Sequence, residues 1–126
     1  MAEFKDYTTI CNSAPSEYLS TIALRNNYTL RKRNLEIIRG NLVILDGFFE
    51  KHAQLFTWKP PKAGPIAFPL FNGGNIEEFC HDLVTRAGII LVPGTIYDPS
   101  YSNFRIGFGR ADLEECVQKL DEYLQT

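Results

Sequence analysis

A long helix over residues 29–54 is the element that most restricts how this chain can fold. Hydrophobic residues recur there at steps of three and four, which is the spacing of one face of an α-helix. The main stripe is Leu35, Ile38, Leu42, Leu45, Phe49 and His52, and beside it lie Ile37, Ile44 and Phe48. Because the apolar arc is so wide, we expect other elements to cover this helix on more than one side. Gly40 and Gly47 within it predict close packing against another backbone.

The remainder of the chain predicts short helices and strands. Pro60 and Pro61 exclude a continuation of the long helix, and Pro69 interrupts a strand expected over 64–71. Asn75 begins a further helix and Gly88 ends it. The other expected elements are a helix over 15–25, strands over 89–92 and 102–110, and a last helix capped by Asp112 with Glu115. We therefore predict an α+β fold in two layers, with helices packed on a small sheet.

Composition limits the classes of function. The 126 residues, of which 44% are hydrophobic, suffice for one domain with its own core. The net charge of -2 provides no broad basic surface for nucleic acid or an anionic membrane. Cys11, Cys80 and Cys116 show neither a metal-binding spacing nor the even number of a disulfide framework. The sequence shows no secretion signal and no apolar run long enough to span a bilayer, so we expect a cytoplasmic protein with reduced thiols.

No catalytic, cofactor-binding or metal-binding group follows from the residue pattern. Cys80 and His81 are adjacent on a predicted helix, where neighbours do not face each other, and Cys80 falls on the apolar stripe. His52 lies at the edge of the long helix's stripe. The acidic pairs at 77–78 and 114–115 occupy first turns of helices, where negative charge is favoured by the helix dipole. Each of these groups is explained by structure alone.

Arg105 is the one residue whose placement also predicts a ligand. In the strand SNFRIGFGR (102–110), alternation puts Phe104, Ile106 and Phe108 on one face. Arg105 then shares the other face with Gly107 and Gly109, which leave room for close approach. Such an arginine is either a solvated charge on the outer face of a sheet or a planar cation suited to a carboxylate.

The second half of the sequence resembles a known family. The run RAGIILVPG (86–94), followed by NFRIGFG (103–109) and a closing amphipathic helix, looks like the C-terminal small domain of class I/II aminotransferases. These are fold-type I enzymes that depend on pyridoxal phosphate (PLP). The segments 6–17 and 60–69 and the long helix are similar to preceding parts of the same enzymes. The resemblance implies a remnant of the large domain over 1–28, an interdomain helix over 29–54 and a small α+β domain over 55–126.

The resemblance also implies a role for Arg105. In the family, the arginine at this strand position binds the α-carboxylate of the amino-acid substrate. The cofactor lysine, the arginine for the PLP phosphate and the aspartate for the pyridine nitrogen belong to upstream segments that have no match here. We therefore expect a fragment that by itself neither binds PLP nor transaminates, although the parent enzyme would use PLP with amino-acid and 2-oxo-acid substrates.

Two further expectations concern partners. The second stripe of the long helix would normally lie against the missing large domain, and its exposure predicts self-association of the fragment. An alternative to the aminotransferase domain is a stand-alone interaction or carboxylate-binding domain without catalysis, in which Arg105 binds a carboxylate and no chemistry follows. In both cases Arg105 is the single predicted site residue.

Overall fold

The computed structural model describes residues 13–125. The chain consists of two compact units, with the boundary between residues 34 and 35. In the first unit, α2 (Ala14–Arg25) carries Pro15 in its first turn, and none of its residues is buried. The next helix, α3 (Asn27–Lys51), begins at once and continues through the division at residue 34 into the second unit. The two helices predicted over 15–25 and 29–54 are thus observed with slightly shifted ends.

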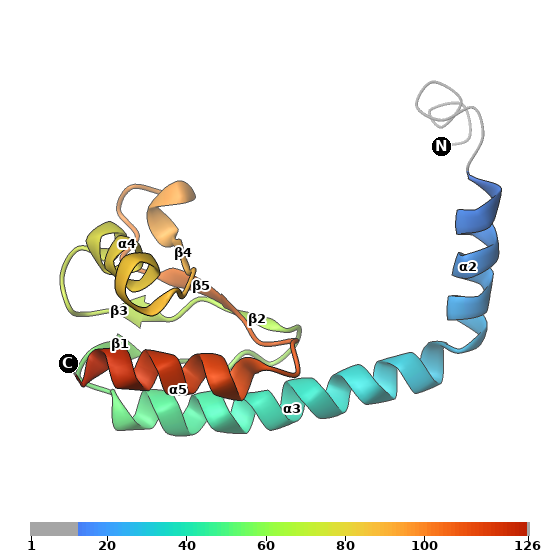
Figure 1. Cartoon of the computed structure of the whole chain (residues 1–126), viewed down its shortest axis with the longest axis horizontal. Helices are drawn as coiled ribbons and strands as arrows, with labels where there is room; N and C mark the ends of the chain where they lie inside the picture. Colours follow the sequence, from blue (N-terminus) through green and yellow to red (C-terminus); the bar gives the residue numbers. More distant parts are fainter. Residues whose placement is uncertain (1–12, 126) are drawn as a thin grey trace. The chain divides into compact units, whose positions relative to one another are not determined.

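The second unit alternates short strands with two further helices. After α3 come β1 (Phe56–Thr57), β2 (Ile66–Ala67), β3 (Leu70–Phe71), α4 (Ile76–Ala87), β4 (Val92–Pro93), the 3-10 turn η1 (Gly94–Ile96), β5 (Phe104–Gly107) and α5 (Leu113–Leu124). Within this unit, α3 and α5 run side by side (Figure 1). The predicted α+β class, with helices on small antiparallel sheets, is confirmed.

The strands form one three-stranded sheet and one two-stranded sheet, both antiparallel. The larger has the order β2-β5-β4, so β5 is central, and the smaller pairs β1 with β3. The strand predicted over 64–71 is therefore two strands in different sheets, separated at Pro69. A proline supplies no N–H to a ladder, which explains why the break falls there.

The predicted strand over 89–92 is wrong for most of its length. Gly88 adopts the left-handed conformation at the end of α4, and the N–H of Ile89 donates to the carbonyl of Leu83. This helix-ending motif holds 88–89 against α4, so the strand begins only at Val92. The start of α4 agrees with prediction: the Asn75 side chain accepts hydrogen bonds from the N–H groups of Glu77 and Glu78.

Aromatic rings make up much of the core. Phe56 lies among five other rings, with centroid distances of 5.6–6.1 Å. Phe48, expected on an uncovered second stripe, is buried and packs on Phe56. The expectation for Gly40 and Gly47 is wrong, because a Cβ added at either would meet no atom within 4 Å. The buried apolar residues are Leu45, Phe48, Phe49, Phe56, Ala67, Phe71, Ile76, Cys80, Leu83, Phe104, Ile106, Phe108, Leu113, Val117 and Leu120.

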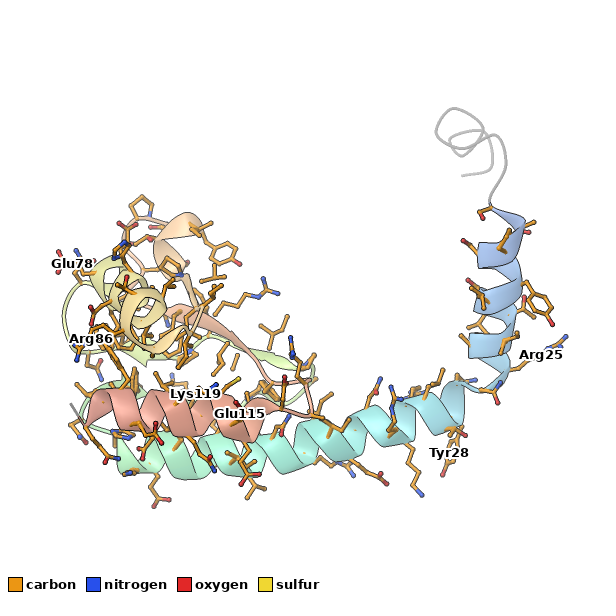
Figure 2. All side chains as sticks on the ribbon, in the orientation of Figure 1. Arg25, Tyr28, Glu78, Arg86, Glu115 and Lys119 are labelled. Carbon is orange, nitrogen blue, oxygen red and sulfur yellow. The ribbon has the colours of Figure 1, made fainter. Side chains whose placement is uncertain are left out.

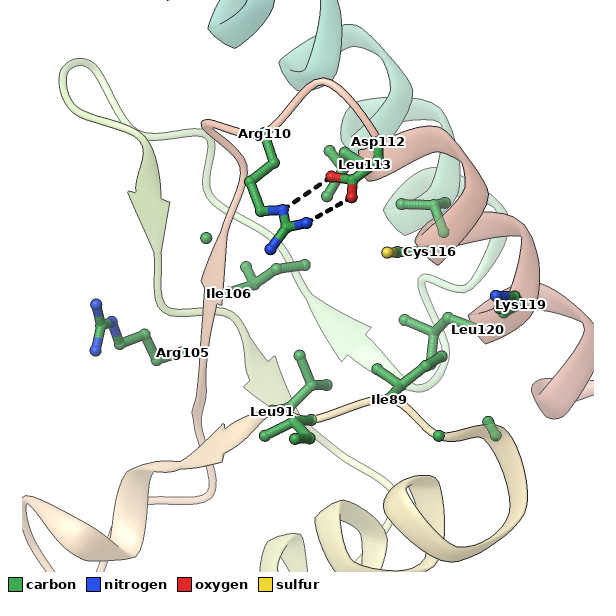
Figure 3. Close-up of a pocket in the computed structure, with 15 residues that line it drawn as sticks. Ile89, Leu91, Arg105, Ile106, Arg110, Asp112, Leu113, Cys116, Lys119 and Leu120 are labelled. Carbon is green, nitrogen blue, oxygen red and sulfur yellow. Dashed lines mark hydrogen bonds and ion pairs between the residues drawn. The ribbon is translucent and has the colours of Figure 1, made fainter.

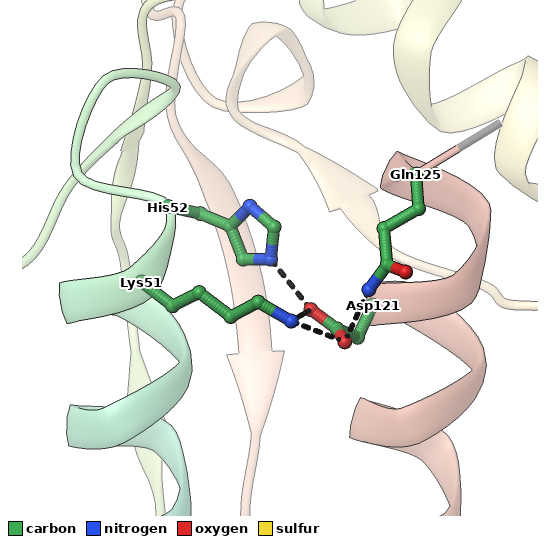
Figure 4. Close-up of polar contacts among 4 residues, drawn as sticks. All are labelled: Lys51, His52, Asp121 and Gln125. Carbon is green, nitrogen blue, oxygen red and sulfur yellow. Dashed lines mark hydrogen bonds and ion pairs between the residues drawn. The ribbon is translucent and has the colours of Figure 1, made fainter.

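Polar contacts join the end of α3 to α5. Buried His52 places its Nε2 atom 2.7 Å from Asp121 Oδ1, and Lys51 Nζ lies 2.6 Å from Asp121 Oδ2 (Figure 4). The amide of Gln125 donates to the same carboxylate at 2.7 Å. His52 is therefore a structural residue that links two helices.

These contacts predict how stability depends on pH. The hydrogen bond from Lys51, and then that from His52, lowers the pKa of Asp121 from its ordinary value of 3.8. A pKa lowered by folding means that the ionised carboxylate adds stability above its unfolded pKa, and that this contribution is lost as the pH falls through the folded pKa. Asp121→Asn should therefore lower the free energy of unfolding at pH 7, with a difference from the parent chain that shrinks below about pH 4.

Urea unfolding at several pH values measures this difference. The matched control is Glu115→Gln, which breaks an exposed 2.8 Å ion pair with Lys119 one turn along α5 (Figure 2). Exposed pairs of this kind contribute little to stability. If Asp121→Asn lowers the free energy of unfolding equally at pH 3 and pH 7, the stabilising role of the ionised Asp121 carboxylate is contradicted.

Candidate functional site

Arg105 lies on the central strand of the larger sheet. Phe104 and Ile106 on either side of it are buried, whereas Arg105 and Gly107 are exposed, so the alternation predicted from the sequence is confirmed. Because β5 has a paired strand on each side, the position of its backbone is set from both edges. The Cα and Cβ atoms of Arg105 therefore have a fixed position, and a binding residue requires such a rigid support.

The neighbours of Arg105 on its face of the sheet are apolar. Val92 on β4 is paired with Arg105, and Ile66 on β2 is paired with Gly107. The same register, continued to the bridge between Leu70 and Asn103, places Phe68 opposite Arg105. Ile66 and Phe68 are 45% and 40% exposed, so this surface is open. We call it the arginine face; it consists of Ile66, Phe68, Val92, Arg105 and Gly107.

Gly107 leaves free space beside the arginine. A Cβ added at Gly107 would meet no heavy atom within 4 Å, and its φ lies outside the left-handed region. Neither packing within residues 13–125 nor backbone conformation therefore requires glycine at this position. The room predicted from the sequence is thus present at Gly107, but the prediction is wrong for Gly109, where an added Cβ would lie 3.1 Å from the Pro65 Cβ atom.

Arg105 carries an uncompensated charge. Within residues 13–125 its guanidinium makes no hydrogen bond or ion pair. By contrast, Arg110 forms two hydrogen bonds to Asp112, at 2.9 and 2.7 Å, and Arg86 pairs with Asp82 at 3.3 Å. A guanidinium stays protonated and has donors in a planar fork that matches a carboxylate. Arg105 is thus free to bind an anion.

An aromatic cluster borders the arginine face. The Phe68 ring meets Tyr97 and Tyr101 edge-on, with centroid distances of 5.9 and 6.0 Å. The Asn103 side-chain amide donates to the carbonyl of Phe68 at 3.0 Å, which fixes the chain at this point. Gly94 lies beneath the cluster, and a Cβ added there would lie 3.0 Å from the Phe68 ring. The loop predicted over 96–103 therefore packs against the site.

One residue that the sequence pattern did not indicate, Asn41, forms hydrogen bonds to the backbone that follows β5. Asn41 on α3 is buried, and its Nδ2 atom donates to the carbonyls of Phe108 and Arg110, at 3.0 and 2.6 Å. The signal was available: Asn41 lies three residues after Ile38 and four before Leu45, within the apolar stripe. A polar residue at such a position must find a partner in the core.

A cavity of about 260 Å³ lies between β5, α5 and the 88–91 segment. Arg105 and Gly107 line it together with the apolar residues Ile106 and Leu120, although the Arg105 side chain points away from Ile106 and Leu120 (Figure 3). Asp112 at its rim is bound by Arg110 and makes no capping hydrogen bond to α5, so the predicted cap at Asp112 is wrong. The cavity thus borders the arginine face at Arg105 and Gly107.

The other chemistry-bearing residues have structural explanations. Cys80 is buried, and burial, followed by the charge of Glu77, raises the pKa of its thiol to about 11, which leaves it protonated. Glu77 accepts a hydrogen bond from Thr95 at 2.7 Å. Cys11 lies outside the described residues. Among residues 13–125 no cluster of His, Cys, Asp or Glu could hold a metal, and every helix is too short or too polar to cross a lipid bilayer.

Comparison with known proteins identifies the fold. Neither protein-family models nor curated proteins gave a match. A PLP-dependent aminotransferase from Streptococcus suis matches with a TM-score of 0.88 and 28% identity, over 98% of this chain and 33% of that one. This chain has the fold of one third of a PLP-dependent aminotransferase. The resemblance predicted from the sequence is confirmed, and the partial coverage is consistent with a C-terminal small domain.

Two further solved structures agree with this result. The PLP-dependent cyclase OrfR has a TM-score of 0.85 and 29% identity, over 98% of this chain and 35% of its own. Aspartate aminotransferase from Thermotoga maritima shares the fold, with a TM-score of 0.77 at 19% identity, over 98% of this chain and 32% of its own. The chain thus spans about a third of the length of the structures it matches.

The described residues include five lysines, and none of them belongs to the arginine face. Enzymes of this kind need a lysine that forms a Schiff base with the cofactor and a partner for its pyridine nitrogen. Every lysine within residues 13–125 lies outside the three strands that carry the arginine face. Two of these lysines, Lys51 and Lys119, form ion pairs with Asp121 and Glu115.

Proposed function

We propose that this chain is the C-terminal domain of a PLP-dependent aminotransferase and that Arg105 binds the α-carboxylate of the amino-acid or 2-oxo-acid substrate. The observation that carries the proposal is the uncompensated guanidinium of Arg105 on an open, otherwise apolar sheet face. The likeness to PLP-dependent aminotransferases supports the reaction class. In this proposal the cofactor and the catalytic lysine belong to the rest of the enzyme.

The geometry of the arginine face suits this role. A carboxylate can accept two parallel hydrogen bonds from the guanidinium fork, and such charge-assisted pairs are about twice as strong as neutral ones. The apolar neighbours Ile66, Phe68 and Val92 offer the guanidinium no competing acceptor from their side chains. Open space at Gly107 gives the ligand access to the arginine from one side.

Two finer points belong to the same proposal. The free thiols of Cys80 and Cys116 fit a reducing compartment such as the cytoplasm. Self-association of the chain through its exposed apolar side chains is part of the proposal as well, and the exposure of Leu35 and Val43 on α3 supports it. The earlier expectation that Phe48 would contribute does not hold, because Phe48 is buried.

The experiment is a titration of the ¹⁵N-labelled chain with propionate, a simple monocarboxylate. Its NMR readout is the Nε–H resonance of each arginine. We expect a saturable shift at Arg105, with a dissociation constant on the order of 10–100 mM, the strength of one charged hydrogen-bonded pair. Arg105→Gln should abolish the saturable binding.

The matched control is Arg110→Gln, which removes an exposed arginine whose guanidinium is already bound by Asp112. This variant should leave the Arg105 shift and its dissociation constant unchanged. Equal shifts at all exposed arginines of the parent chain, without saturation, would overturn the assignment of Arg105.

A further inference from the structure

Asn41 uses both hydrogens of its side-chain amide to hold one short stretch of backbone. It is 6% exposed and lies on the side of α3 that faces the sheet. Nδ2 donates to the carbonyl of Phe108 at 3.0 Å and to that of Arg110 at 2.6 Å. Both acceptors follow the end of β5 at Gly107, and Pro65, to which Phe108 donates, has no N–H of its own to return a hydrogen bond to the Phe108 carbonyl. Asn41 therefore supplies the hydrogen bonds that a neighbouring strand no longer provides.

The same stretch is also held from the opposite side. The N–H of Phe108 donates to the carbonyl of Pro65 at 2.8 Å, and a Cβ added at Gly109 would lie 3.1 Å from the Pro65 Cβ atom. Residues 108–110 are therefore fixed between α3 and the segment that leads into β2. Arg105 lies on β5, three residues before Phe108 in the sequence.

This support adds to the main-chain pairing around Arg105. β5 has two paired residues with β2 and two with β4, and the hydrogen bonds from Phe104 to Pro69 and from Gly94 to Asn103 continue the pairing. Asn41 adds two more, and they come from a helix instead of from the sheet.

We infer that Asn41 is a positioning residue for Arg105: by fixing the exit of β5 to α3, it sets where the guanidinium stands on the arginine face. The inference rests on the proposed function of Arg105. Removal of the amide leaves two carbonyls without their donor, so residues 108–110 shift or open to water. A displaced guanidinium then loses the alignment that two parallel hydrogen bonds require.

The test compares Asn41→Ala and Asn41→Ser with His52→Ala in the ¹⁵N-labelled chain. His52 is the matched control because it is also buried and hydrogen-bonded, directly after the end of α3, but its partner Asp121 lies on α5. Asn41→Ser keeps a small donor and serves if the alanine variant does not fold. The readouts are the Nε–H shift of Arg105, amide hydrogen exchange in β5 and α5, and the dissociation constant of propionate.

We expect the Asn41 variants to move the Arg105 resonance and to speed exchange in β5 more than in α5. Propionate binding should weaken roughly threefold to tenfold, because misalignment of a binding group is costly. His52→Ala should instead speed exchange mainly in α5 and leave propionate binding unchanged.

Unchanged propionate binding and evenly faster exchange in the Asn41 variants would overturn the inference, since a purely structural residue behaves that way. If propionate does not bind the parent chain, the proposed function of Arg105 fails. In that case the exchange and chemical-shift comparison alone decides whether Asn41 positions the strand.

Discussion

The Phe56→Ala variant is expected to lose about 3–5 kcal/mol of its free energy of unfolding, the usual cost of truncating a buried phenylalanine. Phe56 is 2% exposed, and its ring meets those of Phe49 and Phe104 nearly edge-on, with centroids 5.6 and 5.7 Å apart. Alanine removes these contacts and leaves a cavity that rings from several elements would have to fill. Because small domains are stable by only about 5–15 kcal/mol, a large part of the chain's stability is at stake.

Urea unfolding followed by tryptophan fluorescence measures this loss. Trp58 is a suitable probe, because it stacks on Phe49 with centroids 4.4 Å apart and donates to Asp46 at 2.6 Å. The control is Tyr97→Ala, which truncates an exposed ring of the aromatic cluster and should cost less than about 1 kcal/mol. Similar losses in the two variants would show that Phe56 is not central to the core.

The Gly94→Ala variant should also be destabilised, by about 1–3 kcal/mol, because it overpacks a closed site. The new Cβ would lie 2.7 Å from the backbone oxygen of Asn103, which already accepts a hydrogen bond from the Gly94 N–H at 2.6 Å. Backbone atoms in a sheet cannot move aside as the end of a long side chain can. The pairing between η1 and the start of β5 must therefore loosen.

Gly107→Ala is the matched control, because it adds the same methyl group to the same region at a position with no heavy atom within 4 Å. Its free energy of unfolding should stay within about 0.5 kcal/mol of the parent value. Thermal unfolding of the two variants side by side makes the comparison. Equal stability of the Gly94 and Gly107 variants would contradict the tight packing described around Gly94.

The ends of several helices and strands could be predicted from the local sequence. Asn75 and Gly88 bound α4 as expected, and Pro69 marks the break between β2 and β3. Alternation in β5 correctly placed Phe104 and Ile106 inside and Arg105 outside. These features depend on backbone preferences within a few residues, which a sequence displays directly.

Contacts between distant residues were not predictable. Asn41 donates hydrogen bonds to the carbonyls of Phe108 and Arg110, which lie 67 and 69 positions away in the sequence. The residues next to Asn41 in the sequence do not indicate these partners. The helix pattern predicts that Phe48 is uncovered; its contact with Phe56 depends on how the chain turns after α3, which the pattern does not indicate. Asp112 had two possible partners, and the guanidinium of Arg110 binds it instead of the helix N–H groups. For Arg105, the pattern left two interpretations open, and only the family resemblance named a ligand.

The unpaired charge of Arg105 affects which molecules can cover the arginine face, in addition to attracting anions. Whatever covers the arginine face also removes water from Arg105, and burial of a charge without a partner is costly. Neutral or positively charged molecules that fit the apolar surroundings of Ile66, Phe68 and Val92 therefore meet a penalty that an anion avoids. If Arg105 binds a carboxylate as proposed, the same charge would disfavour amines and hydrocarbons of similar shape.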